Sequence, residues 1–379
     1  MAKEDLFVFS NMGTDNLNYI NRRINIDLSM IKGKGRNSIR TITLRDICMQ
    51  NEPITPELKA FLISIGSVSI DSSFIPRARG STAGPGAGTG SVFFRAGEKR
   101  VRLSINKDSQ LSILKVEGEG NVAIFHEGRE IARGKLEPAL AHCPEQAFIT
   151  LCEKCIFDCK YCPVPKLQGH VKSEEEVLSI VDEVLKTGNL KAIALTSGIE
   201  TSVEGEVERV LKLLPALKKY NVPIGVSVYP TAGCSRKFYE AGVSEVKYNV
   251  ETMDCEIFKK VCGDLSLDYI LDRLKEAVDA FGKNRVFSNL IIGLGESDSS
   301  VTEGIETLVK MRVIPILRPV NPHPLRVGDC FTERPSPERI LKLAKIEAEM
   351  LRRYGLNPGL AKTMCLKCTG CDLVSFVDF

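Results

Sequence analysis

The sequence contains no run of 18 apolar residues, so no transmembrane helix is expected. Its first residues, MAKEDLFVFSNMGTDN, bring acidic and polar side chains early, and they lack the apolar segment of a signal peptide. Neither charge sign dominates, because 51 basic residues stand against 48 acidic ones. This balance by itself argues neither for nucleic acid nor for a membrane surface. A cytoplasmic protein with no membrane partner is therefore expected.

Two common phosphate-binding motifs are also missing. The glycine-rich stretch GSTAGPGAGTGS, residues 80–91, has Thr89 where the last glycine of GxGxxG would be needed. It also lacks the GK[ST] ending of a P-loop. The stretch is interpreted as a flexible connector, with a backbone-amide cradle for an anionic ligand as the alternative.

Disulfides are not expected in the cytosol, yet the chain has 13 cysteines. Soft-metal ligation or redox chemistry is the alternative use of so many thiols. Seven of the cysteines fall into two tight groups, and the other six are scattered, as buried packing residues would be. The two groups are Cys152, Cys155, Cys159 and Cys162, followed near the end by Cys365, Cys368 and Cys371.

Residues 1–145 are predicted to form a β-rich accessory domain. Residues 91–105 suggest two strands around Ala96-Gly97, and residues 112–134 suggest three more. Six basic side chains lie in residues 77–102 against the single acid Glu98. A charged outer face of a strand pair is the main interpretation, and a docking surface for RNA or an acidic protein is the alternative.

From residue 146 to 357 strands and helices alternate. One predicted helix, residues 173–188, starts with the N-cap Ser173 and carries Glu176 at the capping-box position. Six such βα units predict an α/β fold with parallel strands and right-handed crossovers. Periodicity leaves open whether the sheet is doubly wound or a partial (β/α)6 TIM-like barrel. In both cases ligands are expected at the carboxyl ends of the strands. Residues 358–379 follow as a short cluster-binding tail.

Cys155, Cys159 and Cys162 form a C-x3-C-x2-C motif directly after the first of these strands. We call them the first cysteine set. Three such thiolates can ligate three irons of a four-iron cluster and leave the fourth iron open to a small molecule. Zinc is less favoured, because the two C-x2-C pairs at 152–162 are separated by only three residues.

This motif in a βα chain resembles the radical S-adenosylmethionine (SAM) superfamily, including the aromatic Tyr161 that packs by the adenine in that family. The resemblance implies a partial (β/α)6 barrel and a [4Fe-4S] cluster whose open iron binds SAM. Reductive cleavage of SAM would then give a 5′-deoxyadenosyl radical that removes hydrogen from the substrate. A low-potential electron donor such as a ferredoxin or flavodoxin is an implied partner, and the substrate is a small molecule or a protein-bound group.

Later motifs resemble the biotin and lipoyl synthase branch. In YNVET, Asn249 and Glu251 match the residues that contact the SAM ribose there, and in IIGLGE, Gly293 and Gly295 match the strand end behind the adenine. In TSGIE, Gly198 and Glu200 are comparable with the family's Gly-Gly-Glu near the SAM amino group, although the spacing is one residue longer. The [2Fe-2S] cysteines of biotin synthase are missing, so a different sulfur source would be required.

Cys365, Cys368 and Cys371, the second cysteine set, have C-x2-C-x2-C spacing, which matches part of a bacterial-ferredoxin loop. They predict an auxiliary [4Fe-4S] cluster, with a structural metal such as zinc as the alternative. The fourth ligand is left open among Cys48, Cys143, Cys152 and Cys330. His142 is interpreted mainly as a solvent-facing linker residue, with ligation of a cluster as the alternative.

Sulfur insertion as in lipoyl synthases is the favoured reaction. The alternatives are radical modification or methylation of a peptide or cofactor, tRNA thiolation, a non-catalytic two-cluster electron carrier and a zinc-stabilised RNA-binding protein.

Overall fold

The computed structural model describes residues 54–76, 87, 90–139 and 141–379, which all belong to one compact unit. None of the described helices is long and apolar enough to cross a membrane. Cys48 and most of the glycine-rich stretch at 80–91 lie outside the described residues.

A small closed β-barrel follows the helix α2 (Pro56–Ile65). Its strands pair in the order β1-β3-β2-β6-β5-β4, and β1 closes the barrel by pairing in parallel with both β3 and β4. Phe93 and Phe94 of β2 are both almost fully buried but face opposite sides of the sheet, and Phe93 packs beside Gly370 of the tail. The strands are β1 (Ser67–Ile70), β2 (Ser91–Ala96), β3 (Lys99–Ile105), β4 (Leu111–Lys115), β5 (Asn121–His126) and β6 (Arg129–Glu137).

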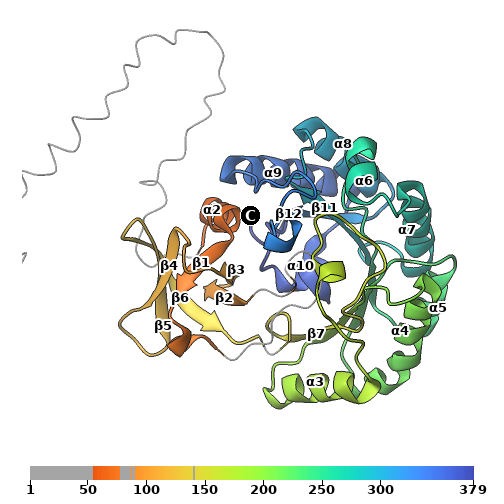
Figure 1. Ribbon diagram of the computed structural model, residues 1–379, viewed down its shortest axis with the longest axis horizontal. Coiled ribbons are helices and arrows are strands. Elements are labelled where there is room, and N and C mark those ends of the chain that lie inside the picture. The colour runs from red at the N-terminus through yellow and green to blue at the C-terminus, as the bar shows by residue number, and fades with distance from the viewer. Residues whose placement is uncertain (1–53, 77–86, 88–89, 140) are drawn as a thin grey trace, which may run out of the picture. The chain divides into compact units, whose positions relative to one another are not determined.

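A second, six-stranded sheet contains only parallel strand pairs and runs in the order β12-β11-β10-β9-β8-β7. A doubly wound sheet reverses direction at a switch point, whereas this order follows the chain. Sequential right-handed crossovers place the helices on one face, which gives the open partial barrel in Figure 1. The strands are β7 (Gln146–Thr150), β8 (Ala192–Thr196), β9 (Ile224–Ser227), β10 (Glu245–Lys247), β11 (Val286–Ile292) and β12 (Ile314–Pro319).

The covering helices start at well-defined caps. The Ser173 hydroxyl accepts a hydrogen bond from the Glu176 N–H, and the Glu176 carboxylate accepts one from the Ser173 N–H. The predicted capping box is therefore present. In four other helices an N-cap serine side chain accepts a hydrogen bond from a backbone N–H of the first turn. The helices are α3 (Glu174–Lys186), α4 (Val203–Leu217), α5 (Cys234–Glu240), α6 (Cys255–Val261), α7 (Leu267–Phe281), α8 (Asp298–Lys310) and α9 (Pro337–Tyr354).

The C-terminal tail bonds to both barrels. It carries α10 (Met364–Cys368), and the Glu245 carboxylate of β10 accepts from the backbone of Lys362 and Thr363 just before it. The Arg102 N–H of β3 donates to Gly370 O at 2.7 Å. These bonds bring the second cysteine set to the large barrel and the small one at once.

Candidate active site

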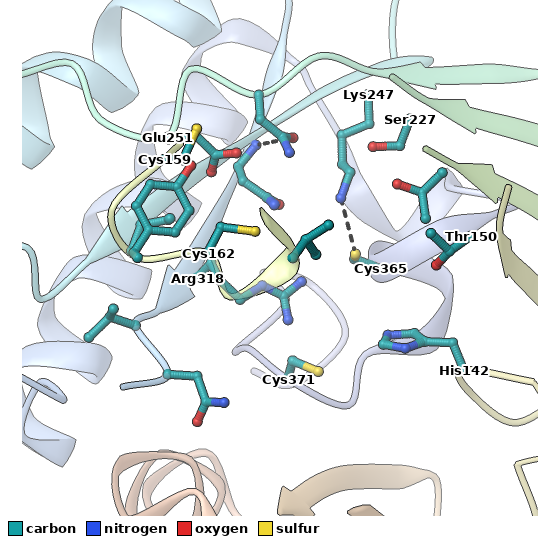
Figure 2. A pocket seen from close by; sticks show the side chains of 18 of the residues that line it. His142, Thr150, Cys159, Cys162, Ser227, Lys247, Glu251, Arg318, Cys365 and Cys371 are labelled. Atoms are coloured by element: carbon teal, nitrogen blue, oxygen red, sulfur yellow. Dashed lines mark hydrogen bonds between the residues drawn. The ribbon is translucent and has the colours of Figure 1, made fainter. Parts of the chain in front are cut away.

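One cavity of about 330 Å³ opens at the carboxyl ends of the parallel strands. The last residue of five strands lines it, as the βα pattern predicts for a ligand site. Figure 2 shows that side chains of both cysteine sets face this space. The five strand-end residues are Thr150, Thr196, Ser227, Lys247 and Pro319.

Hydrogen bonds hold the loop that carries the first cysteine set at four points. They come from the loop after β8, from the end of α6 and from the Arg326 side chain. The bonds are Gly198 N–H to Cys152 O (2.8 Å), Ile156 N–H to Ile199 O (2.8 Å), Lys160 N–H to Val261 O (2.8 Å) and Arg326 Nε–H to Cys162 O (2.6 Å). Such anchoring fixes where the three thiols lie relative to the barrel.

Gly198 lies in the cavity wall and has to be glycine. A Cβ there would lie 2.0 Å from Lys154 O and 3.2 Å from Cys152 O, which are backbone atoms of the cysteine loop. Close packing against the cysteine loop therefore requires glycine at position 198, whatever its role toward SAM.

The three thiols of the first cysteine set hold their protons more tightly than a free cysteine. Burial raises the pKa of Cys155, and it raises the pKa of Cys162 to about 12. For Cys159, the hydrogen bond with Cys262 and then burial raise the pKa. Binding iron requires thiolates, so cluster loading releases protons. No three His, Cys, Asp or Glu side chains of the described residues converge on one metal point, as zinc would need. A cubane takes each thiolate on a different iron and so does not require that convergence.

Tyr161, Asn249 and Glu251 all line the cavity. Asn249 Oδ1 accepts from the Asn289 N–H at 3.2 Å, and the Glu251 N–H donates to Asn289 O at 3.0 Å. Glu251 has φ +61°, a left-handed conformation that costs a non-glycine residue about 1–3 kcal/mol. Burial raises the pKa of the Glu251 carboxyl, against the lowering effects of Lys247 and of hydrogen bonds from Tyr161 and Asn249.

Three predicted SAM contacts do not line this cavity: Glu200, Gly293 and Gly295. The Glu200 carboxylate pairs with Lys154 at 3.5 Å and with Arg209 at 3.1 Å, which favours a structural role. A Cβ on Gly293 would lie 2.1 Å from Glu333 O, and one on Gly295 would touch the Phe331 ring at 3.4 Å. Packing against the loop after β12 therefore accounts for Gly293, and a left-handed φ of +100° accounts for Gly295. The SAM roles of all three residues stay predictions.

The second cysteine set lines the same cavity. Lys247 Nζ donates to Cys365 Sγ at 3.6 Å, and Arg318 hydrogen-bonds Cys371 and pairs with Asp372 at 3.4 Å (Figure 2). Sequence reasoning did not identify Lys247 or Arg318. For Arg318 the available signal was a single cation in the otherwise apolar strand β12, because parallel strands are buried on both faces.

The basic stretch does not form one charged outer face. Of its described members, Arg95 is half-buried, but Arg100 is buried against Glu137 and donates to Cys368 O at 3.1 Å. Arg102 lines the cavity, and its Nη2 is buried without a hydrogen-bond partner. The interpretation as a solvated strand face is wrong for these two arginines, because the tail packs over them.

Residues 149–308 match the family model of the Radical SAM superfamily. These residues form a radical SAM domain. A protein named probable GTP 3′,8-cyclase from Sulfurisphaera tokodaii is 23% identical over 251 residues, which cover 61% of this chain and 77% of that protein. One of the same name from Saccharolobus islandicus is 25% identical over 137 residues, 36% of this chain and 44% of that protein. The chain thus spans less than half the length of the second relative.

Solved structures similar to this chain include methylornithine synthase, with 18% identity, a TM-score of 0.46 and coverage of 53% of this chain and 61% of that one. The FeFe-hydrogenase maturase HydG from Carboxydothermus hydrogenoformans has 17% identity, a TM-score of 0.47 and coverage of 56% and 52%.

The radical SAM domain implies a [4Fe-4S] cluster and SAM, as expected from the cysteine motif. The finer expectation of a biotin- or lipoyl-synthase-like branch is not supported. The relatives named above carry the name of a cyclase and not that of a sulfur-inserting enzyme.

Proposed function

We propose that this protein is a radical SAM enzyme that removes a hydrogen atom from an unactivated C–H bond of a substrate bound between the two cysteine sets. The observation that carries the proposal is that one cavity is lined by both sets, at the carboxyl ends of the barrel strands. A two-cluster electron carrier would need no such enclosed space.

The chain's own residues divide this work. Cys155, Cys159 and Cys162 would hold the cluster that, when reduced by a ferredoxin- or flavodoxin-like donor, supplies the electron for SAM cleavage. Tyr161, Asn249 and Glu251 would position SAM on the same side of the cavity. Apolar walls such as Val228 and Leu265 exclude water from the space where a radical would act.

The second cysteine set would hold a second cluster on the opposite wall. Lys247 and Arg318 direct cationic groups at Cys365 and Cys371. Burial, the larger effect, raises the pKa of Cys371, and the Arg318 charge lowers it. The proposed substrate position lies between this wall and the first cysteine set.

A purine nucleoside triphosphate is the second candidate substrate. The named relatives suggest GTP, and Arg102 has an unpartnered Nη2 group in the cavity, as a phosphate site requires. Its Nε already donates to Ser91 Oγ at 2.9 Å, which fixes the guanidinium plane.

Anaerobic reconstitution followed by dithionite and SAM tests the reaction class. We expect 5′-deoxyadenosine from the wild-type protein and none above background from Cys159→Ala. Cys255→Ala is the matched control, because Cys255 is an exposed free thiol that does not line the cavity. If Cys159→Ala still cleaves SAM, the proposed function is wrong.

Adding GTP to the same reaction tests the second candidate. We expect faster 5′-deoxyadenosine formation and a cyclised nucleotide, both reduced in Arg102→Ala but not in Arg133→Ala, whose side chain lies on the outer face of the small barrel. No effect of GTP on either readout would remove the nucleotide and leave the reaction class intact.

A further inference from the structure

Cys143 lies just before β7 and is 1% exposed. We propose that Cys143 is the fourth ligand of the second cysteine set, which makes it a closed four-thiolate [4Fe-4S] site. The inference rests on the proposed function in one respect, because it takes the second cysteine set as a cluster site.

Direct contact is the first argument. The Cys143 thiol lies close enough to the thiols of Cys368 and Cys365 to interact with both. Cys365 and Cys368 belong to α10, and Thr369 then turns the chain through a left-handed conformation toward Cys371. The fourth thiol therefore approaches this C-x2-C-x2-C segment from a separate part of the chain, just before β7.

A buried glutamine holds the two segments in register. Gln146 is 1% exposed; its Oε1 accepts from the Met364 N–H at 2.7 Å and its Nε2 donates to Met364 O at 3.1 Å. The same Nε2 donates to Cys143 Sγ at 3.6 Å. One side chain thus fixes Cys143 against the first turn of α10, as a second layer of hydrogen bonds does around metal ligands.

The other described cysteine candidates contact different parts of the chain. The Cys152 thiol donates to Lys154 O at 3.3 Å, within the loop of the first cysteine set. Cys330 lies near Arg326, Asp329 and Lys160 and does not line the cavity. His142 remains the competitor, because its imidazole faces the cavity beside Cys365 (Figure 2). Its ring already packs edge-on against Phe148, with centroids 4.9 Å apart.

Charge supplies the second argument. A cubane with four thiolates carries net negative charge, and buried charge requires compensation. Lys247 is 6% exposed and donates to Cys365. Arg318 bonds Cys371 and also pairs with Asp372. Arg100 reaches the backbone of Cys368 and also pairs with Glu137. These cations come from β10, β12 and β3, so they surround the second cysteine set from three elements.

A closed site has a functional consequence. Four protein thiolates leave no iron open, so the second cluster would not ligate the substrate. Cavity side chains would bind the substrate, and only the first cysteine set would keep an open iron.

The test uses full-length protein with Cys155, Cys159 and Cys162 all replaced by alanine, so that only the second site can load. We expect about four irons per chain and no [3Fe-4S] electron paramagnetic resonance (EPR) signal after mild oxidation, because a cubane ligated by four thiolates retains its irons. Adding Cys143→Ala should lower iron to about three per chain and produce the [3Fe-4S] signal. His142→Ala is the matched control and should leave both readouts unchanged.

Cys143→Ser keeps the size and offers a weaker oxygen ligand, so we expect the fourth iron to be partly retained with an altered EPR spectrum. Circular dichroism melting checks that each variant is folded. The proposal is overturned if the background protein already shows the [3Fe-4S] signal, if Cys143→Ala changes nothing, or if His142→Ala rather than Cys143→Ala loses the iron. Because the first cluster is absent, these outcomes are independent of whether the wild-type protein cleaves SAM.

Discussion

At the level of single residues, Gly198 allows the loop after β8 to lie against the first cysteine loop. The two backbones meet through the Gly198 N–H to Cys152 O bond of 2.8 Å. A methyl group at this position has no space, because Lys154 O would lie 2.0 Å away and cannot move without moving the loop.

Gly198→Ala is therefore expected to displace the first cysteine loop and lower iron by about four per chain after reconstitution, together with loss of SAM cleavage. Gly90→Ala is the control, since its added methyl would lie 3.4 Å from Ile105 Cδ1 at an exposed position. Iron analysis and 5′-deoxyadenosine formation measure the two effects. Normal iron in Gly198→Ala would show that the loop tolerates the shift.

At the scale of residues, the sequence predicted which side chains lie together where they belong to one short motif. The first cysteine set and Tyr161 lie within eight residues, and their grouping in the cavity follows from the motif alone. The partnership of Cys143 with Cys368 had no such signal, because it forms between segments far apart in the chain; Gln146 and Met364, which hold it, are 218 residues apart. The sequence offered Cys143 only as one of several candidates.

At the level of elements, the βα pattern and the capping box at Ser173 could be predicted, whereas several short elements could not. The helix α3 starts where the capping box predicts it. The seven-residue α6, the five-residue α10 and the four-residue β1 were missed. Such elements are stabilised by contacts with the rest of the fold rather than by their own periodicity.

The long helix α9 carries a buried acid that makes its packing depend on pH. Burial, followed by repulsion from Asp372, raises the pKa of Glu347 to about 8, although the Ser375 hydroxyl donates to it at 2.9 Å. The folded chain therefore keeps a proton that the unfolded chain releases above about pH 4.5. The contribution of Glu347 to the free energy of unfolding therefore falls as pH rises from about 4.5 to about 8. Above that pH this contribution no longer changes.

Glu347→Gln removes this titration, so the variant should lose less stability than the wild type between pH 5 and pH 8, a difference of up to roughly 5 kcal/mol. Urea unfolding at several pH values measures it. The control is Glu349→Gln, two residues along the same helix and exposed. Parallel pH profiles for wild type and Glu347→Gln would contradict a neutral Glu347.

At the level of the whole molecule, the tail joins both barrels at the cavity. Lys59 of α2 is fully buried, and its Nζ donates to both carboxylate oxygens of Asp378 at 2.8 Å and to Thr369 O at 2.6 Å. Thr369 stands between Cys368 and Cys371, so this single ammonium group connects the first described helix to the second cysteine set. The predicted division into residues 1–145, 146–357 and 358–379 would place these groups in separate parts.

Lys59→Met keeps the length of the side chain but leaves the Asp378 carboxylate buried without its counter-charge, which typically costs about 3–5 kcal/mol. We expect that loss in urea unfolding, and a second cluster that loses iron on oxidation while the first cluster and SAM cleavage remain. Lys107→Met, at an exposed turn of the small barrel, should change stability by less than about 0.5 kcal/mol. In the double variant Lys59→Met/Asp378→Asn, part of the stability should return, because the buried charge is gone. If Lys59→Met proves as stable as the control, or if iron is lost equally from both clusters, the tail does not link α2 to the second site in the way these contacts imply.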